Sequence, residues 1–188
     1  MSVVPVASDL LDAHATQDAA VMPGKLHVVL FEPEIPQNAG NIARTCACTG
    51  ATLHLVEPLG FRLSQKNLKR AGMDYLDDVE MLRHSCAREF LSLHGSEQLL
   101  LFTGSAERSL YDCEIDCKRD VYLVFGRESR GIDPWILQDN AERCVRLPMC
   151  VGARSLNLSN AVAVGVYETL RRNGFAGLQA GNRSCYTG

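Results

Sequence analysis

The sequence lacks the segments that would direct a chain into a membrane or out of the cell. No apolar run approaches the roughly 20 residues that a membrane-spanning helix needs. Residues 1–24 contain three Asp but no Lys or Arg, whereas a signal peptide needs a basic start and a mitochondrial presequence needs Arg. We therefore expect a cytoplasmic protein with no membrane partner, in which residues 1–24 form a flexible extension.

Recognisable metal motifs are also missing. The eight Cys residues include no Cys-x-x-Cys pair, and no second pair has a spacing that would complete a zinc site. Cys46 and Cys144 fall within apolar patterns, where a reduced Cys behaves as a small core residue. We expect no bound metal and mainly structural cysteines, with a metal or disulfide role as the alternative.

The charge balance offers no general attraction for nucleic acid. The formal net charge is −3, and the three Asp of residues 1–24 account for all of it. Removing these three from the 22 acidic residues leaves 19, which equals the 19 basic residues. Because polyanion binding depends on local positive charge, RNA binding would need a basic patch, which two subunits could build together.

After residue 24, short apolar runs alternate with helical patterns. Strands are predicted at residues 26–31, 52–56, 99–103, 121–125 and 144–147. Helices are predicted at residues 38–49, 68–71, 85–93, 134–140 and 158–172.

This alternation favours an α/β domain over residues 25–176, with a mainly parallel sheet, helices on both faces and a tail at 177–188. In such sheets ligands bind beyond the carboxyl ends of the strands. A site is therefore expected in the loops that follow Phe31, Thr103, Phe125 and Leu147.

The first motif covers residues 33–44. Asn38 is expected to cap a helix, and Asn38, Asn41 and Arg44 recur three apart, so they share one polar stripe. Ile42 then faces the core. The stripe is either a solvated helix face or a group of side chains suited to a phosphate or a ribose.

The second motif covers residues 121–132. Gly126 and Gly131 have the spacing of a phosphate-binding P-loop, but Ile132 and Asp133 stand where that motif requires Lys and Ser or Thr. No Gly-x-Gly-x-x-Gly dinucleotide fingerprint is present either. The motif is either an ordinary turn or a place where the backbone approaches a ligand closely.

The third motif covers residues 145–168. Ser155, Asn157, Ser159 and Asn160 are more small polar groups than one helix cap requires. The helix that follows is apolar almost all round, so we expect it to be buried. These polar groups either only cap the buried helix or have a polar partner inside a site, such as a bound ligand.

Together the three motifs resemble the RNA methyltransferases of the SPOUT superfamily, in the SpoU/TrmH-like branch. Within it the TrmL type is most similar, whose members methylate the 2′-oxygen of the wobble pyrimidine of tRNA. The resemblance covers residues 26–174. It implies an α/β fold with a deep C-terminal trefoil knot, a homodimer, tRNA as substrate and S-adenosyl-L-methionine as methyl donor.

The resemblance also implies roles for individual residues. Cofactor-binding positions are Thr103, Gly104, Gly126, Glu128, Leu147, Met149, Ser155 and Leu156. Catalytic positions are Asn41, Arg44, Glu128, Ser155 and Asn157. Substrate-binding positions are Asn38, Arg44, Arg127, Arg130 and Arg154. Further basic candidates for RNA contact are Arg62, Lys66, Lys69 and Arg70.

Two of these positions need comment. A guanidinium stays protonated, so we expect Arg44 to hold a phosphate or to stabilise the developing alkoxide, while a phosphate oxygen or water takes the proton. Arg127 stands where the TrmL type usually has Pro, which affects the loop geometry and could add a phosphate contact.

Two alternatives remain open from the sequence. One is a SPOUT methyltransferase that acts on rRNA, on another tRNA position or on a base nitrogen. The other is a knotted RNA-binding module without catalysis. The larger rRNA-modifying relatives carry an additional RNA-binding domain, for which residues 1–24 are too short, and this favours tRNA.

Overall fold

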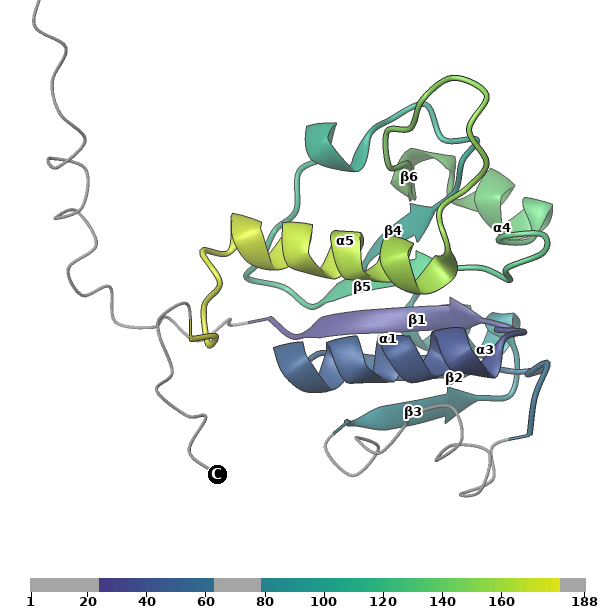
Figure 1. The fold of residues 1–188 in the computed structure, drawn as a ribbon, viewed down its shortest axis with the longest axis horizontal. Helices are drawn as coiled ribbons and strands as arrows, with labels where there is room; N and C mark the ends of the chain where they lie inside the picture. The colour runs from purple at the N-terminus through teal and green to yellow at the C-terminus, as the bar shows by residue number, and fades with distance from the viewer. Residues whose placement is uncertain (1–23, 63–78, 180–188) are drawn as a thin grey trace, which may run out of the picture.

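The computed structural model describes residues 24–62 and 79–179, and these residues build one six-stranded sheet. The strand order is β3-β2-β1-β5-β4-β6, and every neighbouring pair is parallel (Figure 1). The strands are β1 Leu26–Phe31, β2 Thr52–Val56, β3 Met81–His84, β4 Gln98–Phe102, β5 Val121–Phe125 and β6 Cys144–Val145. The predicted parallel α/β architecture is confirmed.

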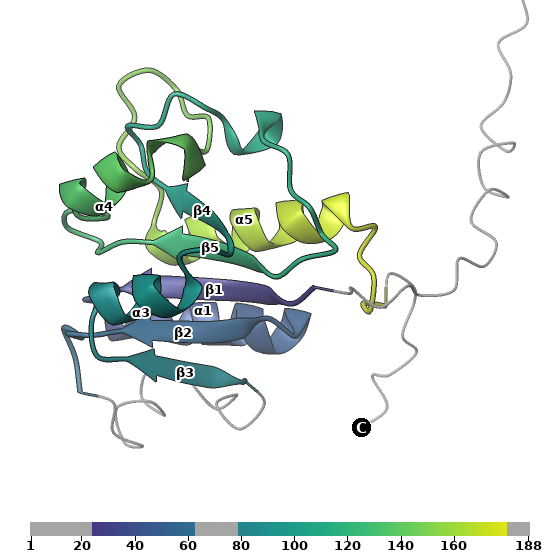
Figure 2. The ribbon, with the colours of Figure 1, turned by 180° about the vertical axis from the view of Figure 1, so that it is seen from behind.

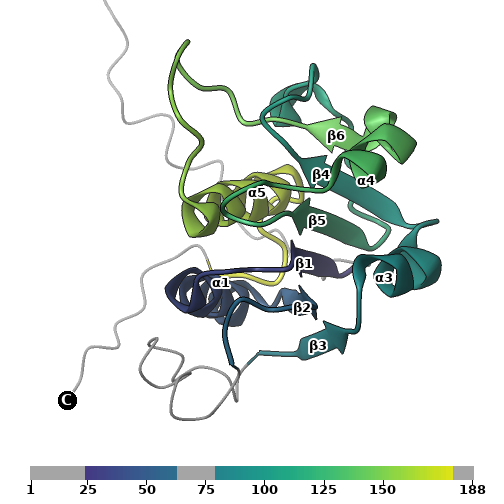
Figure 3. The same cartoon turned by 90° about the vertical axis from the view of Figure 1, so that its right-hand side faces the viewer.

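Helices cover both faces of this sheet, as predicted. Helices α1 and α5 contact one another on one face, and α3 and α4 lie on the opposite face (Figures 2 and 3). The α-helices are α1 Pro36–Thr49, α3 Ala87–His94, α4 Pro134–Asp139 and α5 Leu158–Arg172, and the short 3-10 helices are η3 Leu110–Asp112 and η4 Ala141–Arg143. Among the described residues no helix has the length and apolarity to span a membrane.

The two layers form because strand residues alternate between the faces. On β1, Leu30 packs into the cluster that includes Ile42 and Cys46 of α1. Its neighbour Val29 packs on the other side with Phe90 of α3. Burying such a side chain contributes about 1.5–3 kcal/mol, so a strand buried on both faces is held from both sides. Burial also raises the pKa of the Cys46 thiol to about 12, as suits a reduced core residue.

A row of imidazoles interrupts the apolar layer beneath α3. His27, His54 and His84 lie on the neighbouring strands β1, β2 and β3 and are joined by hydrogen bonds. Burial, and next the nearby His27 and His84, lowers the pKa of His54 to about 3, so this imidazole is neutral at neutral pH.

Two expectations about α1 and α5 are wrong. Ile35, not Asn38, is the residue before α1, and Pro36 opens the helix because its missing N–H needs no partner there. Helix α5 is buried on one side only, since Val164 and Tyr167 are 38% and 48% exposed.

Strand β3, an edge strand, was not predicted, because two of its four residues are exposed. The predicted helix at 68–71 lies outside the described residues.

Candidate cofactor and RNA site

A cavity of about 470 Å³ lies at the carboxyl ends of β4, β5 and β6. Its walls come from the loops after these strands, from the start of α5 and from the segment that leads into α1. The eight residues predicted to bind the cofactor all line it, namely Thr103, Gly104, Gly126, Glu128, Leu147, Met149, Ser155 and Leu156. Three motifs that are far apart in the sequence therefore meet at one opening.

Two aromatic rings form an apolar part of the cavity wall. Phe102 and Phe125 end β4 and β5, and their rings stack with centroids 4.3 Å apart and planes 19° apart. Helix α5 packs closely against this pair at Gly165, where an added Cβ would lie 2.9 Å from Cζ of Phe102. The small residue therefore lets α5 approach the rings.

The loop after β5 closes on itself. The backbone N–H of Arg127 donates to the carbonyl of Gly131 at 3.1 Å, and the N–H of Gly131 donates back at 2.8 Å. A Cβ on Gly126 would lie 2.0 Å from the carbonyl carbon of Gly131. Gly126 is therefore required because the backbone of its own loop packs closely against it, and not because a ligand does. Gly104 differs, because its Cβ would meet no atom within 4 Å.

Glu128 connects this loop to the segment before α1. Its carboxylate accepts hydrogen bonds from the backbone N–H groups of Glu34 at 2.8 Å and Ile35 at 3.3 Å, and from the side-chain amide of Asn38 at 2.9 Å. In return, the Glu34 carboxylate accepts from the N–H and hydroxyl of Ser129, which lowers the pKa of Glu34. Glu128 therefore holds the wall of the cavity in the present structure.

Asn157 adds the third motif to this network. Its side-chain amide donates to the side-chain oxygen Oδ1 of Asn38 at 3.0 Å. Its own side-chain oxygen accepts from the backbone N–H of Ser159 at 2.9 Å, which caps the start of α5. The side chain of Asn157 thus performs two tasks with its two ends.

The basic residues of the prediction are distributed differently. The guanidinium of Arg127 donates to Asp133 at 2.6 Å and to Glu32 at 2.7 Å, and these bonds raise the pKa of Arg127. Arg130 lines the cavity, whereas Arg154 lies exposed in the loop before α5. A phosphate contact by Arg127 would have to compete with two carboxylates, and it stays a prediction.

Arg44 and Asn41 do not line the cavity. Both are exposed on α1, where Asn38 is the buried member of the predicted stripe. Arg44 follows Asn38 by six residues, or about 9 Å along the helix axis. One chain therefore does not bring the predicted catalytic arginine into the cavity wall.

The profile of the SpoU rRNA Methylase family matches residues 25–167. The chain belongs to the SpoU rRNA Methylase family.

Relatives within this family are similar over most of their length. A protein of Saccharophagus degradans named tRNA (cytidine(34)-2′-O)-methyltransferase is 45% identical over 152 residues, which cover 80% of this chain and 97% of the relative. A structure solved to give "structural insights into the 2-OH methylation of C/U34 on tRNA" is 42% identical with a TM-score of 0.72, covering 81% of this chain and 99% of that one.

A more distant SpoU methyltransferase shares the fold. AviRb from Streptomyces viridochromogenes, solved in complex with the cofactor AdoMet, has a TM-score of 0.67 and 22% identity, covering 79% of this chain and 58% of that one. The parallel sheet with helices on both faces is thus the architecture of SpoU methyltransferases.

Several lining residues of this SpoU site were not predicted from the sequence. They are Ile35, Phe102, Phe125, Ser129, Gly131, Leu158 and Ala161. Phe102 and Phe125 immediately precede the predicted loop residues Thr103 and Gly126, so their position at a strand end was the available signal. Glu34 offered no signal, because its contact with Ser129 joins residues that are 95 positions apart.

Proposed function

We propose that this chain transfers a methyl group from S-adenosylmethionine to the ribose 2′-hydroxyl of the wobble pyrimidine, position 34, of tRNA. The names of similar proteins and structures support this substrate and this reaction. The observation that carries the proposal is the convergence of residues 33–44, 121–132 and 145–168 on a single cavity.

The cavity suits the methyl donor in size and in chemistry. Its volume of about 470 Å³ lies within the range of roughly 300–1,000 Å³ that small-molecule sites occupy. Phe102, Phe125 and Leu147 offer apolar surface for an adenine, and Ser155 offers a polar group. Open space beside Gly104 leaves room that a side chain would fill. Once bound, S-adenosylmethionine supplies a methyl group activated by a positively charged sulfur.

The protein must supply alignment and a path for one proton. The ribose 2′-oxygen forms a bond to the methyl carbon as the carbon–sulfur bond breaks, and the hydroxyl proton leaves to a phosphate oxygen or to water. Glu128 and Asn157 keep the loops in register through Asn38. Arg44 holds a substrate phosphate or stabilises the developing alkoxide, since its guanidinium stays protonated.

The proposal includes a homodimer in which Arg44 of one subunit completes the cavity of the other. Its support is that Arg44 is exposed on α1, outside the cavity of its own chain. Helix α5, next to α1, exposes Val164 and Tyr167 on its outer side. Exposed apolar side chains on α5, beside α1, suit an isologous contact between copies.

The trefoil knot and a cytoplasmic location also belong to this proposal. After edge strand β6, residues 146–157 lead the chain back to α5, which packs against the central strands β5 and β1. This return across the sheet is what the knotted family fold requires of the chain. A tRNA substrate accords with the cytoplasm.

The test is methylation of separated tRNA and rRNA with isotope-labelled cofactor, followed by mass spectrometry of the nucleosides. The expected product is a 2′-O-methylated pyrimidine nucleoside from tRNA, mapped to position 34 by digestion into oligonucleotides. Label in rRNA alone, or on bases alone, would overturn the proposed substrate. Absence of label in both RNAs, together with no binding of S-adenosylmethionine in calorimetry, would favour a non-catalytic knotted module.

A further inference from the structure

Four histidines from four elements gather on the α3 side of the sheet, away from the cavity of the proposed methyl transfer. They are His27 of β1, His54 of β2, His84 of β3 and His94, the last residue of α3. None of them lines the cofactor cavity. Their sequence spacing follows no metal motif, so no bound metal was expected here.

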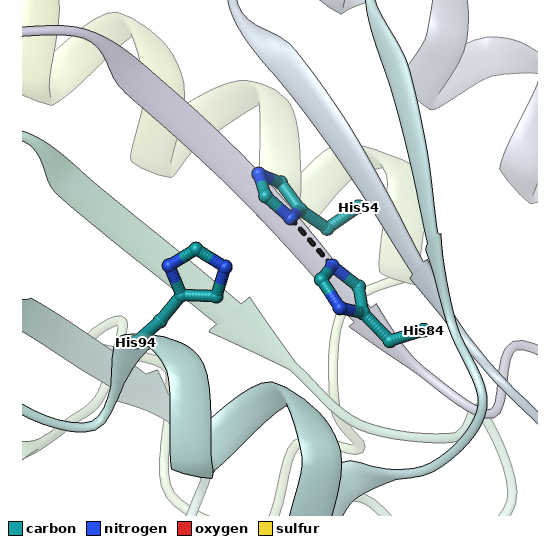
Figure 4. Close-up of side chains that lie close together, drawn as sticks. All are labelled: His54, His84 and His94. Carbon is teal, nitrogen blue, oxygen red and sulfur yellow. Dashed lines mark hydrogen bonds between the residues drawn. The ribbon is translucent and has the colours of Figure 1, made fainter.

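Three of these imidazoles present nitrogen atoms to a shared space. One ring nitrogen from each of His54, His84 and His94 lies within 4.8 Å of the other two (Figure 4). Nδ1 of His54 and Nε2 of His84 are 2.9 Å apart. His54 is fully buried, His84 is 7% exposed and His94 is half-buried. The group is therefore nearly enclosed by protein.

The contacts behind His54 favour a lone pair on one particular nitrogen of its ring. Nε2 of His27 lies 3.6 Å from the carboxylate of Asp120, which favours a proton on that nitrogen. Nδ1 of His27 must then accept, so Nε2 of His54 donates to it across 2.9 Å. A neutral imidazole has one donor and one acceptor. Nδ1 of His54 is therefore an acceptor that faces His84 and His94.

We propose that His54, His84 and His94 form a binding site for one divalent transition metal ion of the zinc type. Nδ1 of His54 and Nε2 of His84 are the ligand atoms on the sheet, a ring nitrogen of His94 is the third, and water takes the fourth position. Imidazole nitrogen suits Zn²⁺, Co²⁺, Ni²⁺ and Cu²⁺, whereas Mg²⁺ and Ca²⁺ prefer oxygen ligands.

Small movements suffice to reach metal-binding geometry. Zn–N bonds of about 2.0–2.1 Å place tetrahedral ligand atoms about 3.4 Å apart. The His54–His84 pair must open slightly from 2.9 Å, and the widest separation in the trio must close from at most 4.8 Å. His94 is the last residue of α3, before Gly95, so a small shift of the helix end can bring its imidazole closer to the other two. Nε2 of His84 must release any proton to become a ligand.

The remaining histidine supplies the outer layer of such a site. Metal-bound imidazoles commonly donate their other N–H to an acceptor, and a carboxylate often stands behind it. Here His54 donates to His27, and His27 faces Asp120. The ion would tie edge strand β3 to β2 and α3, which makes the site structural and independent of methyl transfer.

The test is a titration of the full chain, prepared without a histidine tag and treated with chelator, with Co²⁺ and then Zn²⁺. We expect one equivalent of Co²⁺ to give visible absorption typical of tetrahedral nitrogen ligation, and Zn²⁺ to displace it. Both His94→Gln and His84→Gln should abolish this absorption. His27→Asn should weaken Co²⁺ binding about 10–100-fold while keeping the spectrum, because it removes only an outer-layer partner.

Two controls separate the site from other metal binding and from misfolding. Replacing the exposed thiols of Cys48, Cys86 and Cys150 with Ser should leave the Co²⁺ spectrum unchanged. Zn²⁺ should raise the melting temperature of the wild type but not of His94→Gln, whose metal-free form should melt like metal-free wild type. Methyl transfer should persist in chelator. No Co²⁺ absorption in the wild type, its retention in His94→Gln, or its loss in the Ser variant would each overturn the proposal.

Discussion

The side chains of Asn157 and Asn38 are joined by a 3.0 Å hydrogen bond although 119 positions separate them in the sequence. Asn38 uses its carbonyl oxygen for Asn157 and its amide for Glu128, so all three motifs of the site are connected through one residue. Asn38 itself is buried, and both of its bonds are partly buried. The three motifs are therefore joined in one hydrogen-bond network along the cavity wall.

The double task of Asn157 can be separated by substitution. Asn157→Asp keeps the oxygen that caps α5 but replaces the amide that donates to Asn38, whereas Asn157→Ala removes both. We expect methyl transfer to fall at least about tenfold in both variants. Only the Ala variant should lose about 1 kcal/mol of unfolding free energy, as for a lost cap. Urea denaturation and single-turnover methylation measure the two effects; wild-type turnover in Asn157→Asp would contradict the role of the bridge.

Glu128→Gln should loosen the segment before α1. The carboxylate accepts three N–H donors, and a Gln side chain offers only one oxygen and turns its amide towards a donor. Hydrogen bonds to a charged group contribute about 1.5–3 kcal/mol, so we expect a loss of that order in unfolding free energy and weaker cofactor binding in calorimetry.

Glu34→Gln is the matched control for Glu128→Gln. Among the residues that the structure describes, its carboxylate accepts from the backbone N–H and hydroxyl of Ser129, and both bonds are exposed. The loss in unfolding free energy should therefore be smaller than for Glu128→Gln. The reverse order would show that the network is not centred on Glu128.

The two glycines of the cavity should respond in opposite ways. A side chain at Gly104 meets open space, so Gly104→Val should leave the melting temperature nearly unchanged but weaken S-adenosylmethionine binding at least about tenfold by filling the cavity. Gly126→Ala forces Cβ against the backbone of Gly131 and should destabilise the fold by more than about 1–3 kcal/mol. Calorimetric titration and thermal unfolding distinguish these results. Wild-type S-adenosylmethionine affinity in Gly104→Val would show that the cofactor does not bind beside Gly104.

The sequence was sufficient for every strand of the sheet except β3 and for most of the cavity, for a physical reason. Continuously apolar strands such as 121–125 must be buried on both faces, and the loops after parallel strands converge, so Gly126 and Leu147 had to lie near one another. The predicted capping role of Asn38 was wrong. The sequence marks Asn38 as a residue type that caps helices, but it does not show that Glu128 lies close enough to accept a hydrogen bond from the Asn38 amide.

Other features depend on contacts that a linear pattern does not contain. Phe102 and Phe125 read as core residues, and only the folded chain shows that their rings border a cavity. The imidazoles of His54 and His84 form a hydrogen bond although the two residues are not paired across the strands. The register of β2 and β3 pairs His84 with Val56, two residues after His54. The proposed role of Arg44 in the cavity of a second subunit would depend on contacts between chains, which no single-chain pattern describes.

Arg44→Lys tests whether the guanidinium fork is needed. Lysine keeps the positive charge but loses the paired donors. We expect kcat to fall at least about tenfold with unchanged S-adenosylmethionine affinity, because the proposed contacts of Arg44 are with the RNA and not with the cofactor. Equal turnover by Arg44→Lys would limit Arg44 to a point charge.

Mixing two impaired variants, at an S-adenosylmethionine concentration too low to saturate Gly104→Val, tests the sharing of Arg44 between subunits. Arg44→Ala retains an intact cavity, and Gly104→Val retains Arg44. After dissociation and reassociation, roughly a quarter of wild-type activity should return, since half of the dimers are mixed and each has one complete site. If no activity returns although mixed dimers form, Arg44 acts within its own chain.

The anchor of α5 should make stability depend on acid pH. The Glu168 carboxylate accepts from Arg171 at 2.8 Å and from Arg172 at 2.7 Å, and these bonds lower the pKa of Glu168 from 4.5 to about 2. Arg172 also donates to the carbonyls of Leu110 and Cys113, which ties η3 to the helix. The pair therefore holds a connection between distant segments.

The sign of this dependence follows from proton binding. Between pH 4.5 and about 2 the unfolded chain takes up a proton at Glu168 that the folded chain does not, so acidification favours unfolding. The contribution is complete above pH 4.5 and is lost as the pH falls towards 2. Glu168→Gln should be less stable at pH 7 and show a shallower decline in urea unfolding from pH 5 to pH 3. Glu107→Gln, at an exposed position, should keep the wild-type slope; an unchanged slope in Glu168→Gln would remove Glu168 as the cause.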